Sequence, residues 1–246
     1  MRQVAWGGML PAAVAWVVIS TSATANARND DQPIHSAPRT NQFKAVARGK
    51  DTLVAVGPGV AIWSSSDGAA WTRRDSGLPF ALYAVAYGND TFVALGNEGA
   101  LVTSTDGAQW IVRDSGTDER LRGLTHAKGV FVAVGYAGTI LTSANGAHWT
   151  RRKSGTTARL QGVAFGHDKF VAVGWNGVIR TSTNGTRWTA RSSGVSARLQ
   201  SIKYREGLFV ASGCDGIQIL STCGVAWTAE GEPKHGVVVR SVPVPE

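Results

Sequence analysis

Short runs of apolar residues, separated by turn residues, fill most of the chain. In one representative stretch, runs at 160–165 and 170–173 are separated by Gly166, His167 and Asp168. Two further β-rich runs, 178–182 and 187–191, follow turns that contain Asn and Gly. Runs of this length bounded by Gly, Asn and Asp predict β-strands, and their close spacing predicts an antiparallel meander of four strands.

This four-strand pattern recurs five times at a fixed step of 39 residues. Columns of tryptophan, glycine, alanine and serine keep that step without insertion or deletion; the tryptophans are Trp71, Trp110, Trp149, Trp188 and Trp227. The copies lie at approximately 42–80, 81–119, 120–158, 159–197 and 198–236, and we expect a short C-terminal strand at 237–244. Self-similarity at such a period indicates a repeat architecture.

The second strand of each copy predicts how the copies pack. Phe131 to Gly135 is apolar at successive positions, which indicates a strand that is covered on both faces. Radially packed blades provide that cover. The sequence therefore predicts an all-β domain over 42–246, a β-propeller of five four-stranded antiparallel blades. A closed ring and a fragment of a larger propeller both fit the pattern.

A turn motif in each copy resembles a known family. Ser65-Ser66-Asp67-Gly68 with Trp71 resembles the Asp-box, or BNR repeat, of sialidase-like propellers, although that box normally has one more residue between Asp and Gly. The stretch from Phe131 through Ser143 is similar to the BNR-type propellers related to photosystem II assembly and stability factors, which have more than five blades. The resemblance covers nearly all of the chain after the leader and implies the propeller fold and a protein-binding scaffold.

The acid position of the box has a structural interpretation. It is occupied by Asp67, Asp106, Asn145 and Asn184 in the first four copies, and by Cys223 in the fifth. Asx side chains organise turns by accepting backbone N–H bonds, and the tryptophan that follows shields the turn. We therefore expect these residues to hold the blades together rather than to bind ligand.

The N-terminus predicts export. Met1 and Arg2 precede an apolar stretch, and Ala25-Asn26-Ala27 supplies a small-x-small cleavage site, so residues 1–27 read as a signal peptide. Residues 28–41 are polar and predict a flexible lead-in. The formal net charge is +8. A basic secreted or periplasmic protein can meet acidic peptides or anionic glycans; we expect no nucleic-acid partner, because no nucleic-acid motif is present, and no membrane span after cleavage.

No motif specifies a catalyst. Glycoside hydrolysis is the activity that the sialidase resemblance would imply, but the Arg-Ile-Pro signature before the blades is missing and no carboxylate pair is evident. The histidines have no metal-ligand spacing, so we expect no metal and no cofactor. Cys214 and Cys223 fall in turns at opposite ends of one strand, too far apart for a disulfide with each other, which predicts two free thiols or an intermolecular bond through Cys214.

A candidate ligand site lies on the face opposite the boxes. Arg120, Arg159 and Arg198 each precede a first, innermost strand, and the turn between the second and third strands varies from copy to copy. The variable turns supply Asn97, Glu98, Tyr136, Trp175, Asn176 and Asp215. Varied loops on a repeated framework are typical of a binding face. Guanidinium groups beside aromatic rings would suit an anionic ligand, unless local acids such as Asp118 and Glu119 pair with them.

These patterns favour an exported, non-enzymatic scaffold that binds a protein or an acidic peptide. A lectin-like carbohydrate-binding propeller is the alternative, and a sialidase-like glycoside hydrolase is a more distant one. The oligomeric state stays open at this point.

Overall fold

The computed structural model describes residues 43–57 and 59–230, which form twenty strands in five sheets. Blade 1 contains β1 (Ala45–Arg48), β2 (Leu53–Val56), β3 (Ala61–Ser65) and β4 (Thr72–Asp75). Blade 2 contains β5 (Leu82–Gly88), β6 (Thr91–Gly96), β7 (Leu101–Ser104) and β8 (Ile111–Val112). Blade 3 contains β9 (Leu121–Ala127), β10 (Val130–Gly135), β11 (Ile140–Ser143) and β12 (Thr150–Arg152).

Blade 4 contains β13 (Leu160–Gly166), β14 (Lys169–Gly174), β15 (Ile179–Ser182) and β16 (Thr189–Arg191). Blade 5 contains β17 (Leu199–Arg205), β18 (Leu208–Gly213), β19 (Gln218–Ser221) and β20 (Thr228–Glu230). Short 3₁₀ turns, η2 (Tyr136–Gly138), η3 (Trp175–Gly177) and η4 (Cys214–Gly216), join the second and third strands of the last three blades.

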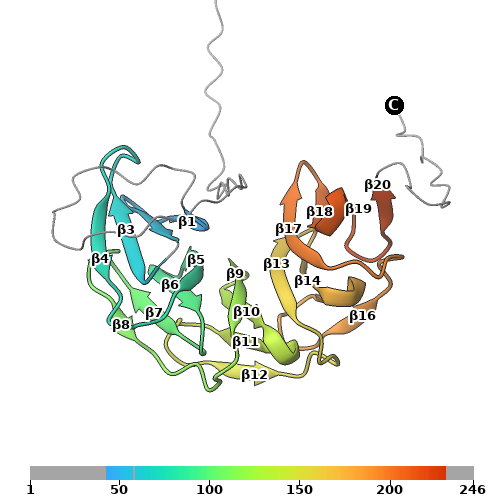
Figure 1. Ribbon diagram of the computed structural model, residues 1–246, viewed down its shortest axis with the longest axis horizontal. Coiled ribbons are helices and arrows are strands. Elements are labelled where there is room, and N and C mark those ends of the chain that lie inside the picture. Colours follow the sequence, from blue (N-terminus) through green and yellow to red (C-terminus); the bar gives the residue numbers. More distant parts are fainter. Residues whose placement is uncertain (1–42, 58, 231–246) are drawn as a thin grey trace, which may run out of the picture.

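Each sheet pairs its strands in chain order, all antiparallel, with the first strand innermost and the fourth outermost. The five blades follow one another around an arc, as Figure 1 shows. The innermost strands β1, β5, β9, β13 and β17 pack side by side in that order. The prediction of an all-β fold with five four-stranded antiparallel blades is confirmed.

Apolar side chains fill the space between successive blades. Between blades 3 and 4, Val132 and Val134 of β10 pack in one buried cluster with Leu160 and Phe170 of the next blade. The phenylalanine recurs as Phe92, Phe131, Phe170 and Phe209, all among the most deeply buried side chains. Because strand 2 of a middle blade contacts neighbours on both faces, its successive residues are all apolar, as the sequence predicts.

The arc is open between its last blade and its first. Within residues 43–57 and 59–230, no packing comparable to that between successive blades joins β17 to β1, and Figure 1 shows blade 5 standing across the opening from blade 1. The outward face of blade 5 has changed accordingly. Ser212 and Gln218, which face each other across β18 and β19, occupy positions that are Val173 and Ile179 in blade 4. These two residues make the face of blade 5 that points away from blade 4 more polar than the matching face of blade 4.

The box turns are held as the sequence predicts. In blade 1, Asp67 Oδ1 accepts hydrogen bonds from the backbone N–H groups of Ala69 and Ala70 at 2.8 and 2.9 Å, and the Ser65 hydroxyl bonds it at 2.9 Å. The Trp71 indole N–H donates to the Gly68 carbonyl at 3.0 Å. The backbone N–H of Ala70, then that of Ala69, lowers the pKa of Asp67.

The same contacts recur in the next three blades. The acid-position oxygens of Asp106, Asn145 and Asn184 each accept two backbone N–H bonds of 2.8 to 3.2 Å. The indoles of Trp110, Trp149 and Trp188, and that of Trp227 in blade 5, donate to the glycine carbonyls of their turns. The structural interpretation of the boxes is therefore confirmed by their geometry.

Both cysteines are free, as their placement predicts. Cys223 occupies the acid position of the fifth box. The pKa of its thiol is lowered by the backbone N–H groups of Ala226 and Val225, and also by Ser221 and the charge of Lys169, against the opposing effect of burial. Backbone N–H groups of the turn therefore lower the pKa at the acid position in blade 5 as they do at Asp67 in blade 1.

We predict that Cys223 titrates at lower pH in the folded chain than in the unfolded chain. In a Cys214→Ser variant, the pH midpoint of iodoacetamide alkylation should be lower in buffer than in urea, because the thiolate is the reactive form. A thiol pKa depressed by folding stabilises the fold above the unfolded pKa, and this stabilisation is lost as pH falls through the folded pKa. Equal midpoints in the two states would contradict the prediction.

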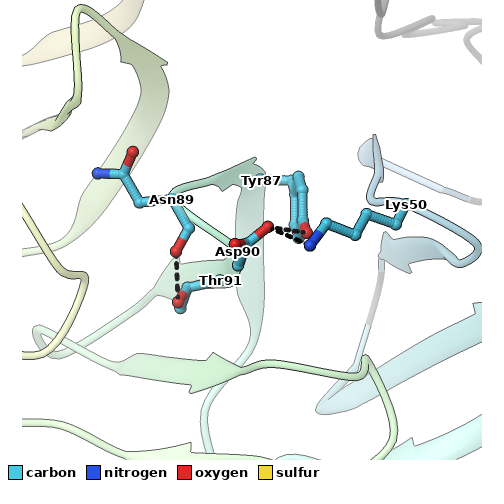
Figure 2. Close-up of polar contacts among 5 residues, drawn as sticks. All are labelled: Lys50, Tyr87, Asn89, Asp90 and Thr91. Atoms are coloured by element: carbon cyan, nitrogen blue, oxygen red, sulfur yellow. Dashed lines mark hydrogen bonds and ion pairs between the residues drawn. The ribbon is translucent and has the colours of Figure 1, made fainter.

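Hairpin tips on the box face connect neighbouring blades. Figure 2 shows the Asp90 carboxylate between the Lys50 ammonium, 2.8 Å away, and the Tyr87 hydroxyl, 3.2 Å away. The side chain of Asn89 donates instead to the carbonyls of Gly129 and Ala144 in blade 3, at 3.0 and 2.7 Å. These contacts tie blade 2 to blades 1 and 3 on this face.

The signal peptide at 1–27, the lead-in at 28–41 and the strand at 237–244 lie outside the described residues, so these three remain predictions. Among the described residues, no helix is long and apolar enough to cross a bilayer. The same part of the chain contains no cluster of three potential metal ligands.

Candidate functional site

The face opposite the boxes carries a row of alternating cations and aromatic rings. The Arg159 guanidinium carbon lies 4.5 Å from the Tyr136 ring centroid and 4.3 Å from that of Trp175. The guanidinium carbon of Arg198 lies 4.3 Å from the Trp175 ring centroid, and that of Arg120 lies 5.2 Å from the Tyr136 ring centroid. The structure therefore brings together the three arginines and both aromatic residues that the sequence singles out.

The row extends to the first blade through residues that sequence reasoning missed. Arg122 and Lys44 each lie 4.4 Å from the centroid of the Tyr83 ring, and Arg120 lies 6.0 Å from it. We call the whole set the ladder; in spatial order it comprises Lys44, Tyr83, Arg122, Arg120, Tyr136, Arg159, Trp175 and Arg198. It spans the inner rim of all five blades.

Backbone hydrogen bonds build the ladder. The N–H of Tyr136 donates to the Arg120 carbonyl and that of Trp175 to the Arg159 carbonyl, both at 2.9 Å. Each bond ties the turn after strand 2 to the residue that precedes strand 1 of the same blade. Because the blades are built alike, Arg159 also contacts Tyr136 of the preceding blade, and Arg198 contacts Trp175 of the preceding blade. Cations and rings of successive blades therefore alternate.

A β-bulge in the inner strands of blades 2 to 5 places two of the missed residues, Tyr83 and Arg122. The register shifts by one residue between Leu82 and Ala84, so Tyr83 has no partner in β6, and the same shift leaves Gln161 unpaired in blade 4. Bulges re-aim side chains and are frequent beside functional sites. The column comprises Lys44, Tyr83, Arg122, Gln161 and Gln200. Its mixture of cations, an aromatic residue and amides was the signal in the sequence that could have marked this column as part of a binding site. The sequence does not show the bulge that brings Tyr83 and Arg122 to the ladder.

The predicted turn residues occupy less central places. Glu98 and Asn176 are exposed, with φ of 50° and 57°, at the left-handed position of their turns. Asn97 continues the Tyr136 column, and its Oδ1 is buried without a hydrogen-bond partner in the described part of the chain. The side chain of Asp215 lies outside what the structure describes.

The ladder is an uncompensated positive site. Among the described residues, no ion pair joins a cation of the ladder to an acid, so Asp118 and Glu119 do not neutralise it. The ion pairs within the described part of the chain, Lys50–Asp90 and Lys128–Asp168, lie on the box face. Burial, followed by the charges of Arg122 and Arg120, lowers the pKa of Lys44.

The positive charge of the ladder also affects the pKa of Tyr136. Burial raises the pKa of its phenol, but a hydrogen bond from Arg120 and the charges of Arg120, Arg122 and Arg159 outweigh burial and lower the pKa overall. A local excess of positive charge therefore exists before any ligand arrives. An anion placed against the ladder would relieve it.

A concave cavity of about 400 Å³ adjoins the ladder along the inner strands. Its lining includes Lys44, Tyr83 and Arg122 of the ladder, together with Lys203 and Arg205 of β17. None of the described residues that line it is Asp or Glu. The cavity and the ladder thus form one continuous cationic surface.

Comparison with solved structures identifies proteins with a similar fold. The chain superposes on YCF48 from Cyanidioschyzon merolae with a TM-score of 0.57 at 15% identity, covering 75% of this chain and 70% of that one. A structure of YCF48 bound to D1 peptide gives a TM-score of 0.59 at 20% identity, covering 76% of this chain and 66% of that one. The chain has the fold of the YCF48 β-propeller.

The repeat geometry is also shared with a designed protein. The computationally designed Ika8 protein superposes with a TM-score of 0.59 at 13% identity, covering 73% of this chain and 58% of the design. The chain therefore spans between 58% and 70% of the length of these three structures. No protein-family model and no curated protein matches the sequence. The resemblance to the photosystem II assembly-factor propellers is confirmed at the level of fold.

Proposed function

We propose that this chain is an exported, non-enzymatic propeller that binds an acidic segment of a protein or peptide along the ladder. The observation that carries the proposal is the row of five cations interleaved with three aromatic rings on one rim, without a described acid to pair with it. A rigid row of guanidinium groups is pre-organised for carboxylates, which it can engage through paired N–H donors.

The geometry specifies which part of the ladder would contact ligand. Each of the three rings is already flanked by two cations of the chain itself, as Trp175 is by Arg159 and Arg198. We infer that the rings hold the guanidinium groups in place and that the N–H groups not already bonded, unlike Arg122 Nε, which donates to Gln161, would bind the ligand. This favours recognition of several carboxylates in a row over stacking of a single flat group on the rings.

Two further observations support the proposal. A propeller of the same fold, YCF48, has been solved bound to D1 peptide, which shows that the fold can bind a peptide. The cationic cavity offers no described carboxylate in its lining, whereas glycoside hydrolysis usually needs two carboxyl groups about 5 to 10 Å apart across the sugar bond. That lining supports the non-enzymatic part of the proposal.

A binding screen of the full chain against arrayed acidic peptides and anionic glycans tests this proposal. We expect the acidic peptides to bind with an affinity that falls as salt rises, because exposed charges are screened. The Arg159→Ala/Trp175→Ala variant should weaken that binding by about tenfold or more, since two rungs are lost.

The outcomes separate the candidate functions. Selective binding of anionic glycans, lost in the same double variant, would replace the peptide proposal with a lectin-like one. Peptide binding that survives the double variant would place the site elsewhere. Hydrolysis of a sialoside or another glycoside by the purified chain would overturn the non-enzymatic reading.

A further inference from the structure

The outer edge of blade 2 differs from the outer edges of the other blades. Its outermost strand, β8, consists of Ile111 and Val112, whose side chains are 55% and 48% exposed. The matching pairs in the other four blades are Thr72–Arg73, Thr150–Arg151, Thr189–Ala190 and Thr228–Ala229. Outer strands usually carry polar or charged residues that prevent edge-to-edge pairing. Of the five outer strands that the structure describes, β8 alone has apolar side chains at both positions.

The backbone of β8 is available for pairing. β8 pairs with β7 on its inner side and has no strand on its outer side among the described residues. The N–H of Arg113 donates inward to the Leu101 carbonyl at 2.8 Å. Hydrogen-bonding direction alternates along an antiparallel strand, so the N–H and C=O groups of Trp110 and Val112 point to the free edge.

We propose that a second copy of this chain pairs with β8 in antiparallel fashion, about a two-fold axis centred on Ile111. In this register Ile111 faces Ile111 of the second copy, in the non-hydrogen-bonded position where side chains lie closest. Trp110 of each copy faces Val112 of the other copy, and the two residues of each such pair exchange backbone hydrogen bonds. A C₂ interface uses the same patch on both copies, which is the requirement that a self-complementary strand meets.

The flanking residues agree with this register. Gln109 faces Arg113 of the second copy, so an amide oxygen meets a guanidinium group and no like charges oppose each other. The Arg113 side chain is already oriented, because its Nε donates to the Thr103 hydroxyl at 3.0 Å. The same arginine-to-hydroxyl bond recurs in blades 1, 3 and 4, from Arg74, Arg152 and Arg191, so this arginine does not distinguish blade 2 and the two apolar residues do.

Sedimentation of the full chain from micromolar to near-millimolar concentration, in moderate salt to screen its net positive charge, tests the proposal. We expect a reversible monomer–dimer equilibrium. The Ile111→Thr/Val112→Arg variant reproduces the outer strand of blades 1 and 3, so it should fold normally, and it should stay monomeric throughout. Its melting temperature, measured alongside, confirms that folding is intact. The Arg159→Glu variant of the ladder should dimerise like the unmodified chain.

A matched pair of charge variants tests the register. Gln109→Glu places a carboxylate opposite Arg113 of the second copy and should strengthen the dimer, by about fivefold for two equivalent pairs. Gln109→Lys places like charges together and should weaken it by a similar factor. A chain that is monomeric at every concentration would overturn the proposal, as would a dimer that persists in Ile111→Thr/Val112→Arg or the reverse order of the two Gln109 variants.

Discussion

Replacing Phe170 with alanine is expected to lower the free energy of unfolding by about 3 to 5 kcal/mol. The Phe170 side chain is fully buried and packs in one cluster with Val132, Val134 and Leu160, at the junction of blades 3 and 4. Removing the ring leaves a cavity that two rigid sheets cannot close, so both the transfer energy and the cavity energy are lost. Urea denaturation followed by tryptophan fluorescence would measure the change.

An exposed substitution in the same blade provides the control. Thr189→Ala on the outer strand β16 should change the free energy of unfolding by no more than about 0.5 kcal/mol, because it removes no buried contact. A loss below about 1 kcal/mol in Phe170→Ala would mean that packing between the blades contributes little to stability, since filled cores rarely tolerate such a truncation. The open arc would then need another source of cohesion.

Charge reversal at Arg159 should have the largest effect on ligand binding. The Arg159→Glu variant is expected to weaken binding of an acidic peptide by about 100-fold, because like charges brought together at an interface cost several kcal/mol. Arg159 flanks both Tyr136 and Trp175, so its loss interrupts the ladder at its centre. The new carboxylate can also pair with the neighbouring arginines and neutralise them.

Arg187→Glu is the matched control for this reversal. Arg187 is exposed on the box face, next to Asn184, and its substitution changes the net charge by the same amount. We expect a decrease in affinity of about threefold or less, from long-range attraction alone, at an ionic strength where screening acts within about 10 Å. Equal losses in the two variants would show that the peptide responds to net charge and not to the ladder. Isothermal titration at two salt concentrations would separate these cases.

The repeat made most of the fold predictable. Five copies at a fixed step define strands, turns and their order, and the uninterrupted apolar run from Phe131 to Gly135 indicates cover on both faces. The boxes were predictable for a related reason, because an Asx side chain bonds to its own turn and needs no distant partner. Because the box contacts form within a single turn, the packing of the rest of the molecule has little influence on them.

The candidate site was only partly predictable. Arg159 and Trp175 could be placed on one face because antiparallel topology determines which loops share an end of the sheet. Tyr83 and Arg122 were missed because a one-residue bulge re-aims them, and the bulge depends on how the inner strand meets its neighbour. The interleaving of rungs between successive blades is likewise a matter of their relative placement.

By itself, the sequence determined the class of fold, the number of blades, the free cysteines and the structural role of the boxes, because each depends on spacing along the chain or on contacts within one turn. Only the tertiary structure decided that, within residues 43–57 and 59–230, the arc is open between blades 5 and 1 and the apolar strand β8 has no outer partner, and that cations and rings form one ladder. The opening between blades and the contacts between neighbouring blades, such as that of Arg159 with Tyr136, depend on how whole blades pack, which spacing along the chain does not determine.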